Sequence, residues 1–291
     1  TMEWFFEKAG GPTVDGVISL TPGVIQELLG VTGPIEMPEY NTTITKENFI
    51  LQTQQEVENE YNRQLNRPKK FLADLAPKLF AKLFEDKQAM QKLLPIMEKS
   101  LTEKQMGMYF FDEKLQSKAQ QFNWTAEVKP ADKDYLAIAD NNIGGGKTDL
   151  LIDTQIEEEV MIQDDGSVIK KVTIKRAHTG KPGGFSVKNI DWMKIYVPKG
   201  SVLLSAQGFE PLHSIERNKE YANDPIILKQ ETESTLHKES QTRIFEESGK
   251  TVFGNWTSLE PEQSKTLEIM YRLPFSIQLS RGGTNAQSYS L

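Results

Sequence analysis

The chain has 291 residues, of which 37% are hydrophobic and 26% are charged, and its formal net charge at pH 7 is -7. This length suggests two ordinary domains, and the composition is that of a folded protein. The acidic balance argues against nucleic-acid partners, because phosphate neutralisation needs clustered Lys and Arg. Since the chain has no cysteine, disulfides, thiolate metal sites and a cysteine nucleophile are excluded.

In the first half of the chain, apolar residues recur mostly at helical spacing. The pattern predicts helices over residues 1–9, 22–29, 45–65, 69–83, 88–101 and 112–122. Apolar strands are expected between them at residues 14–20, 106–111 and 134–140. Helices interleaved with strands indicate a layered α/β domain, for which we expect the bounds 1–140.

In the second half, apolar residues alternate as they do in strands. A hairpin over residues 150–176 should turn at Asp164-Asp165-Gly166, with Val168, Val172 and Ile174 among exposed lysines. Further strands are expected at residues 189–197, 202–206, 242–247, 250–257 and 264–272. This spacing predicts an antiparallel β-sandwich over residues 141–291, so the fold class expected for the whole chain is α+β or α/β.

A glycine loop joins the two halves. Residues 141–148 nearly match the phosphate loop G-x-x-x-x-G-K-[ST], but Asn141 stands in place of the first glycine. That motif needs a helix behind it, whereas the apolar run that follows indicates a strand. We therefore interpret the segment as a structural crossover loop in which glycines permit positive φ, with a nucleotide site as the alternative. The loop residues are Asn142, Gly144, Gly145, Gly146 and Lys147.

Several segments together are similar to a known family. They are VDGVISLTPGVIQELLGVTGP at 14–34, NRPKKFLADL at 66–75, DYLAIADNNIGGGK at 134–147, VPKGS at 197–201 and YRLPF at 271–275. In combination they resemble the bacterial domain of unknown function 4012 family, over most of the chain. The resemblance implies an extracytoplasmic protein of the cell envelope. It also implies a membrane-anchored parent protein that is truncated here at both ends, with a missing N-terminal anchor as its membrane contact.

The segment 14–34 is also similar, more distantly, to the LytR-CpsA-Psr proteins, which transfer glycopolymers from a polyprenyl-pyrophosphate carrier to the cell wall. In those proteins, arginines ahead of a segment like residues 69–75 hold the pyrophosphate. The resemblance implies phosphate binding by Arg63, Arg67, Lys69 and Lys70. Guanidinium groups suit this role because they bind phosphate oxygens bidentately. The alternative is a basic surface patch that balances nearby glutamates.

Two functions remain open, and the sequence favours the first. The first is a non-catalytic binding or scaffold module that holds a glycan or another envelope protein. The second is a glycopolymer transferase or carrier-binding protein of LytR-CpsA-Psr type, although that family's other key arginine and aspartates have no counterpart here. His178, His213 and His237 lack metal-ligand spacing and are expected at the surface. Accordingly we expect no catalytic residue, metal or cofactor. Trp192 and Trp256 are expected in the core, with a carbohydrate platform as the alternative.

Overall fold

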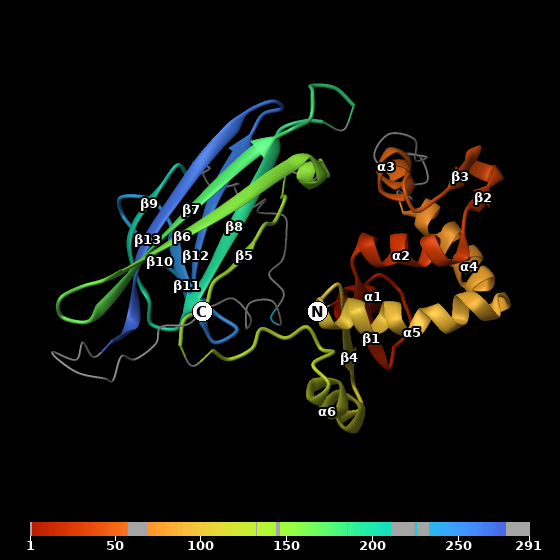
Figure 1. Ribbon diagram of the computed structural model, residues 1–291, viewed down its shortest axis with the longest axis horizontal. Helices are drawn as coiled ribbons and strands as arrows, with labels where there is room; N and C mark the ends of the chain where they lie inside the picture. The colour runs from red at the N-terminus through yellow and green to blue at the C-terminus, as the bar shows by residue number, and fades with distance from the viewer. Residues whose placement is uncertain are drawn as a thin grey trace. The chain divides into compact units, whose positions relative to one another are not determined.

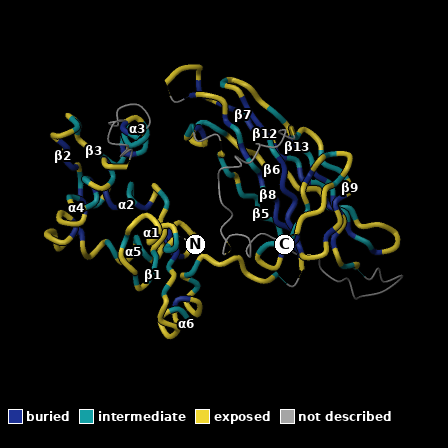
Figure 2. The backbone as a smooth tube through the Cα atoms, turned by 180° about the vertical axis from the view of Figure 1, so that it is seen from behind, coloured by how far each residue is buried: buried dark blue, intermediate teal, exposed yellow. Residues whose placement is uncertain are grey.

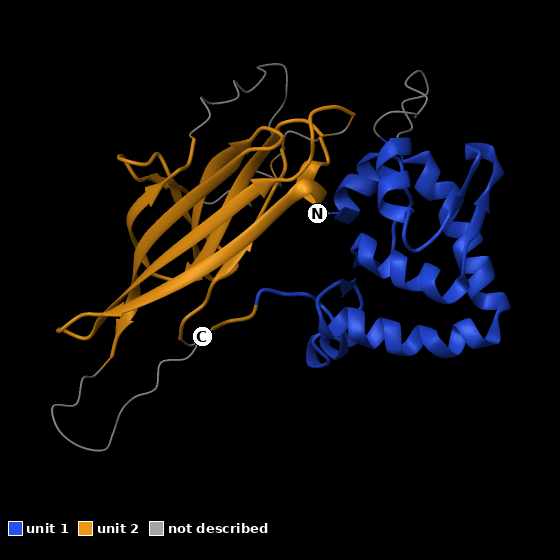
Figure 3. Ribbon diagram, turned by 45° about the horizontal axis from the view of Figure 1, so that its top comes forward, with its two compact units in different colours: residues 1–128 blue, residues 129–291 orange. Residues whose placement is uncertain are grey.

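The computed structural model describes residues 2–57, 69–131, 133–143, 146–184, 186–210, 225 and 233–277. The chain forms two compact units, Thr1–Val128 and Lys129–Leu291 (Figure 3). Helices dominate the first unit and antiparallel strands the second, so the fold is α+β (Figure 1). The units divide ahead of residue 140, because the strand expected to end the first domain, β5 (Ala137–Ala139), pairs with a strand of the second unit.

The first unit combines helices with two small sheets. Its helices are α1 (Met2–Lys8), α2 (Pro22–Thr32), α3 (Phe49–Gln55), α4 (Lys70–Glu85), α5 (Lys87–Thr102) and α6 (Glu113–Gln121). Its strands are β1 (Gly16–Leu20), β2 (Ile35–Met37), β3 (Thr42–Ile44) and β4 (Met106–Phe110), with η1 (Pro38–Tyr40) between β2 and β3. β1 pairs with β4 and β2 with β3, both antiparallel. The described helices of this unit therefore accompany two separate two-stranded ribbons.

One face of helix α4 provides a large part of the apolar core of this unit. Phe71, Leu75, Leu79 and Leu83 recur every four residues on one face of the helix and are no more than 2% exposed. Burial of one such side chain is worth roughly 1.5–3 kcal/mol, so this stripe anchors the core formed with α2, α3, α5, β2 and β3. The helix continues through Pro77.

The second unit consists mainly of strands. After β5 come η3 (Thr148–Leu151), β6 (Ile152–Ile162), β7 (Ser167–His178), β8 (Asn189–Pro198), β9 (Val202–Gln207), β10 (Thr235–Leu236), β11 (Arg243–Glu247), β12 (Lys250–Leu259) and β13 (Ser264–Ser276). One antiparallel sheet has the order β10-β11-β12-β8-β5, and the other has the order β6-β7-β13-β9. Side chains from β7 and β13 of one sheet and from β8 and β12 of the other share one core, which confirms the predicted sandwich.

Strand β7 contributes both apolar and charged side chains to that core. Its residues alternate between the two faces, and Val168, Val172 and Ile174 are fully buried. Lys170 and Arg176 lie in the same phase and are buried with them, so the expectation that every lysine here is exposed is wrong for Lys170. Buried residues also run along nearly all of β12, drawn dark blue in Figure 2. The sandwich core is therefore apolar in the middle and carries charges on one of its central strands.

Candidate functional site

The glycine loop leads into one turn of 3-10 helix and then into a strand. Lys147 has a left-handed backbone, with φ 55, and is followed by η3 and directly by β6. Within the described stretch 146–184, no α-helix begins behind the loop, so the N–H groups and dipole that hold phosphate are missing there. Gly144 and Gly145 lie outside the described residues. The arrangement of the described loop residues is that of a crossover between the sheets.

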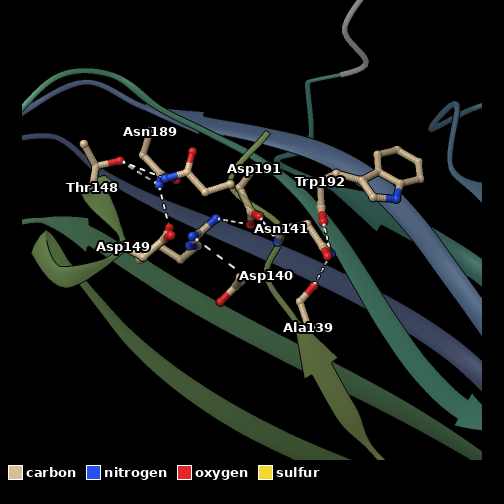
Figure 4. Close-up of polar contacts among 10 residues, drawn as sticks. Ala139, Asp140, Asn141, Thr148, Asp149, Asn189, Asp191 and Trp192 are labelled. Carbon is tan, nitrogen blue, oxygen red and sulfur yellow. Dashed lines mark hydrogen bonds and ion pairs between the residues drawn. The ribbon is translucent and has the colours of Figure 1, made fainter. Parts of the chain in front are cut away.

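Polar side chains tie the loop to β8. Asn189 Nδ2 donates hydrogen bonds to Thr148 Oγ1 at 3.0 Å and to Asp149 Oδ1 at 2.9 Å (Figure 4). Asn142 Nδ2 donates to the same Thr148 oxygen at 3.3 Å. Thr148 and Asn189 are both fully buried. Asn142, chosen from the sequence as a loop residue, is thus brought together with Asn189, which the sequence analysis did not single out.

Beside these contacts, a buried arginine joins the two sheets. Arg176 of β7 donates from Nη1 to Asp191 Oδ2 of β8 at 2.8 Å, and its Nη2 lies 3.9 Å from Asp140 Oδ1. The other oxygen of Asp191 accepts a hydrogen bond from the backbone N–H of Asn141 at 2.6 Å. Asp191 is 0% exposed and Arg176 is 2% exposed. Because removal of either partner would leave a buried charge uncompensated, the pair strongly couples the sheets.

The electrostatics of this cluster are unusual. Burial raises the pKa of Asp191 from 3.8 to about 7, assisted by the charge of Asp140 and opposed by Arg176. Perturbed carboxyl groups occur at catalytic sites and also in structural ion-pair networks. Here the carboxylates face a guanidinium group of the same chain. Among the described residues, no group of three or more His, Asp or Glu side chains could hold a metal ion. The arrangement is therefore suited to holding the sandwich together.

A second group of ion pairs is formed by Lys170 of β7. Lys170 Nζ lies 2.6 Å from Asp134 Oδ2 and 2.5 Å from Glu158 Oε2. The side chains of Lys170 and Asp134 are wholly buried, and that of Glu158 is 26% exposed. The period-two pattern of β7 carried the signal for this pair, because Lys170 shares the phase of Val168 and Val172.

The histidines differ from the sequence expectation. His178 is only 2% exposed, so its prediction as a surface residue is wrong. Its Nε2 lies 3.1 Å from the carbonyl oxygen of Val187, and its Nδ1 accepts the N–H of Gly180 at 3.2 Å. With Nδ1 as the acceptor of that N–H, Nε2 is the ring nitrogen that faces the carbonyl oxygen of Val187. His237 is half-buried beside Ser240. His213 lies outside the described residues.

Of the four candidate phosphate ligands, the structure describes two. Arg63 and Arg67 lie outside the described residues. Lys69 is exposed and precedes α4, and Lys70 begins that helix. Lys70 forms an ion pair with Asp74, which raises the pKa of the lysine and lowers that of the aspartate. Lys70 thus has an acidic partner one helical turn away.

Two tryptophans lie on the outer face of the five-stranded sheet. Trp192 and Trp256 are direct cross-strand partners on β8 and β12, and their ring centroids are 5.0 Å apart. The neighbouring Met193 points into the core, so Trp192 must point outward, and its ring leads away from the polar cluster (Figure 4). Both tryptophans are half-buried, so their prediction as core residues is wrong.

The outer face around these rings has both aromatic and polar neighbours. A Cβ atom added to Gly254 would lie 2.6 Å from Trp192 Cζ2 and 3.1 Å from Phe245 Cε1, so glycine provides the space that the indole ring fills. Lys194 Nζ lies 2.7 Å from Glu247 Oε2, and the hydroxyl of Tyr196 donates to the same carboxylate at 2.6 Å. Burial opposes ionisation of Glu247, but these two partners outweigh it and lower the pKa of the carboxyl.

In comparisons with known proteins, only the beginning of the chain has a match. A family model described as "Protein of unknown function (DUF4012)" matches residues 1–57. No curated protein and no solved structure matches the chain. The matched stretch contains the segment 14–34, so the match supports the family resemblance there. Among the described residues, no helix combines the length and the apolar character that a bilayer crossing requires.

Proposed function

We propose that the chain is a non-catalytic binding module of a bacterial cell envelope, and that its sandwich holds a glycan on the outer face of the five-stranded sheet. The envelope setting rests on the family resemblance, which the match over residues 1–57 supports. The observation that carries the binding proposal is the pair of tryptophans, Trp192 and Trp256, at the middle of that face.

The chemistry of this face suits a sugar. An indole ring presents a flat, electron-rich surface with a polar N–H at its edge, and such rings bind surfaces that are apolar on one side and wet on the other. The C–H groups of a pyranose ring provide the apolar side, and its hydroxyls provide the wet side. Lys194, Tyr196 and Glu247 lie on the same outer face as Trp192 and offer hydrogen-bonding groups to those hydroxyls.

The buried charges favour a role without catalysis. A general acid or base must lie within hydrogen-bond reach of its substrate. Asp191 and Arg176 are paired with each other inside the sandwich, and so are Lys170 and Asp134. Each of these four side chains contributes to cohesion between the sheets and is closed off from solvent. These buried charged residues are thus occupied in holding the fold.

A sedimentation experiment tests the proposal. The purified chain is mixed with insoluble bacterial cell-wall material and centrifuged, and the bound fraction is measured against polymer concentration. We expect native chain to co-sediment saturably and Trp192→Ala or Trp256→Ala to lose at least about tenfold in affinity, as for a buried aromatic anchor. Trp124→Ala, which removes a partly exposed tryptophan of the first unit, is the matched control and should bind normally. Equal binding by all variants would contradict the proposal.

The carrier-binding alternative is tested with native chain, Trp192→Ala and one further variant, Arg67→Ala. A LytR-CpsA-Psr-like protein would bind a polyprenyl pyrophosphate through Arg63, Arg67, Lys69 and Lys70. Binding of that lipid by native chain but not by Arg67→Ala, together with no effect of Trp192→Ala, would favour the alternative over a glycan-binding sandwich.

A further inference from the structure

The amine of Lys170 contacts two carboxyl groups in a buried site of the second unit. Its Nζ lies 2.6 Å from Asp134 Oδ2 and 2.5 Å from Glu158 Oε2, and the side chains of Lys170 and Asp134 are wholly buried. A nitrogen this close to a carboxyl oxygen is roughly 3–3.5 Å from the carboxyl carbon, which is the separation of a near-attack arrangement. The amine and the carboxyl of Asp134 are therefore placed to react with each other.

The surroundings of Lys170 favour the form of the amine that can react. Its register partners on the two neighbouring strands are Val160 of β6 and Tyr271 of β13. Tyr271 is 0% exposed, and Val168 and Val172, in the same phase of β7, are fully buried. An interior of this kind favours neutral over charged groups, so transfer of the ammonium proton to a carboxylate costs less there than in water. The neutral amine that results is a nucleophile.

The carboxyl of Asp134 is oriented as the electrophile. Its Oδ1 accepts the backbone N–H of Tyr135 at 2.8 Å, while its Oδ2 faces Lys170. A backbone donor on one oxygen stabilises the negative charge that develops there when a nucleophile attacks the carboxyl carbon. Because Glu158 contacts the same nitrogen, its carboxylate can take a proton from that nitrogen and pass it to the leaving oxygen.

Other buried cations of the sandwich lack this combination. Arg176 faces the carboxylate of Asp191, but a guanidinium group stays protonated and is not a nucleophile. Lys250 is 3% exposed, and its Nζ donates to the backbone carbonyl oxygen of Lys129 at 2.9 Å. Of these three cations, Lys170 is the one with both a nucleophilic atom and a carboxyl carbon within reach.

We propose that Lys170 and Asp134 condense to an intramolecular amide bond, with Glu158 as the residue that moves the protons. A bond forms between Lys170 Nζ and Asp134 Cγ, the bond from Cγ to Oδ2 breaks, and that oxygen leaves as water. The ammonium group supplies both hydrogens of the water and keeps its third on the amide nitrogen. Glu158 thus ends as it began, and no co-reactant is needed.

The bond joins the beginning of the second unit to β7, an interior strand of the four-stranded sheet. The segment that contains β5 could then no longer separate from β7. The ion pair is the reactant of this step, so its own contribution to stability is a property of chain that has not yet lost water. The reaction occurs once in each molecule, and it is independent of the proposed glycan binding.

Mass spectrometry of the intact, full chain tests the proposal. Native chain, kept folded at neutral pH until its mass is constant, should be lighter than its sequence by one water molecule. Lys170→Arg should have its full mass, because it lacks the nucleophile. Glu158→Gln should lose water at least about a hundredfold more slowly, because it cannot transfer the protons. Glu157→Gln, which changes the neighbouring, 61% exposed glutamate of β6, is the matched control and should react as native chain does.

Peptide mapping distinguishes this bond from other losses of water. Digestion of native chain should give a branched peptide in which Asp134 is joined to Lys170. Cyclisation at Asp165-Gly166 would also remove one water molecule, but it would leave Asp134 and Lys170 in separate peptides. Circular dichroism establishes that each variant is folded, so that the full mass of Lys170→Arg is not due to unfolding. Native chain of full mass, a loss of water mapped elsewhere, or equal rates in native chain and Glu158→Gln would overturn the proposal.

Discussion

Lys170 and Asp134 form an ion pair inside the sandwich, with 2.6 Å between Nζ and Oδ2 and no exposure of either side chain. Six residues further along each segment, Arg176 and Asp140 again approach each other, at 3.9 Å. Between these contacts β7 inserts Val172 and Ile174 into the core. The strand thus places one positive charge on either side of its apolar centre, and each of them meets a carboxylate of the segment that contains β5.

The first prediction concerns the pair of Lys170 and Asp134. Lys170→Met leaves a buried carboxylate without its main partner, and we expect the free energy of unfolding to fall by about 3–5 kcal/mol. The double variant Lys170→Met/Asp134→Leu removes both charges and should recover most of that loss. Urea unfolding followed by tryptophan fluorescence measures both. A single variant within about 1 kcal/mol of native chain would show that the pair does not hold the sheets.

The second prediction concerns the pH dependence of stability through Asp191. Its pKa is about 7 in the folded chain against an ordinary value of 3.8, so the folded chain retains a proton that the unfolded chain loses. The stability due to this group is therefore full below about pH 4 and is lost as the pH rises to about 7. Relative to that of Asp191→Asn, the free energy of unfolding of native chain should fall by about 1 kcal/mol per pH unit across this window.

Asp165 is the control for this titration. Its hydrogen bonds from Ser167 lower the pKa of its carboxyl, so its contribution is present above its ordinary pKa and is lost as the pH falls through the lower folded value. Asp165→Asn should therefore change the pH profile with the opposite sign and only in the acid range. The free energy of unfolding is plotted against pH for both proteins. If its slope between pH 4 and pH 7 is the same for native chain and for Asp191→Asn, the assigned protonation of Asp191 is wrong.

The third prediction compares two turn glycines with similar backbone angles. Gly166 ends the β6–β7 turn with φ +80, and a Cβ atom there would lie 2.2 Å from the carbonyl oxygen of Ile277. Gly249 lies in the β11–β12 turn with φ +70 and has nothing within 4 Å of that position. Gly249→Ala should cost about 1 kcal/mol for the left-handed backbone alone, and Gly166→Ala about 1–3 kcal/mol more. Thermal unfolding measures the stability of both variants. Equal losses of stability in Gly166→Ala and Gly249→Ala would contradict the close approach of Ile277.

The fourth prediction concerns the space under Trp192. Gly254→Ala places a methyl group against the indole ring and forces it to move. We expect a changed tryptophan emission spectrum and weaker glycan binding, with stability reduced by no more than about 1–3 kcal/mol. Gly107→Ala, in the first unit, also introduces a clash but changes no residue of the glycan face, and should leave glycan binding unchanged. Normal glycan binding by Gly254→Ala would show that binding does not depend on the position of the Trp192 ring.

Much of the sandwich could be predicted from the sequence, because strand alternation and turn residues are local properties. The hairpin turning at Asp164-Asp165-Gly166 and the strands on either side of Gly200 and Gly249 are present as expected. What the local pattern does not contain is the choice of partner strand. The strand at residues 137–139 reads as the end of an α/β layer, but it pairs antiparallel with β8 and so belongs to the second unit.

The candidate site was harder to predict, since its members are far apart in the chain. Asn142 and Lys147 attract attention as part of a glycine loop, yet the contacts that fix the loop come from Asn189 and Asp191, more than forty residues later. Lys170 and Arg176 were readable from the phase of β7, but a charged residue in an apolar phase is ordinarily assigned to the surface. Only the partner carboxylates, Asp134 ahead of β5 and Asp191 on β8, make their burial favourable.

The most direct test of the account is the set of indole N–H resonances, because the chain has four tryptophans and one variant of each assigns them. During titration with soluble cell-wall oligosaccharides, the resonances of Trp192 and Trp256 should shift together and saturably, while those of Trp4 and Trp124 stay in place. Shifts confined to Trp4 or Trp124, or no shift at any tryptophan, would contradict a glycan-binding face on the five-stranded sheet.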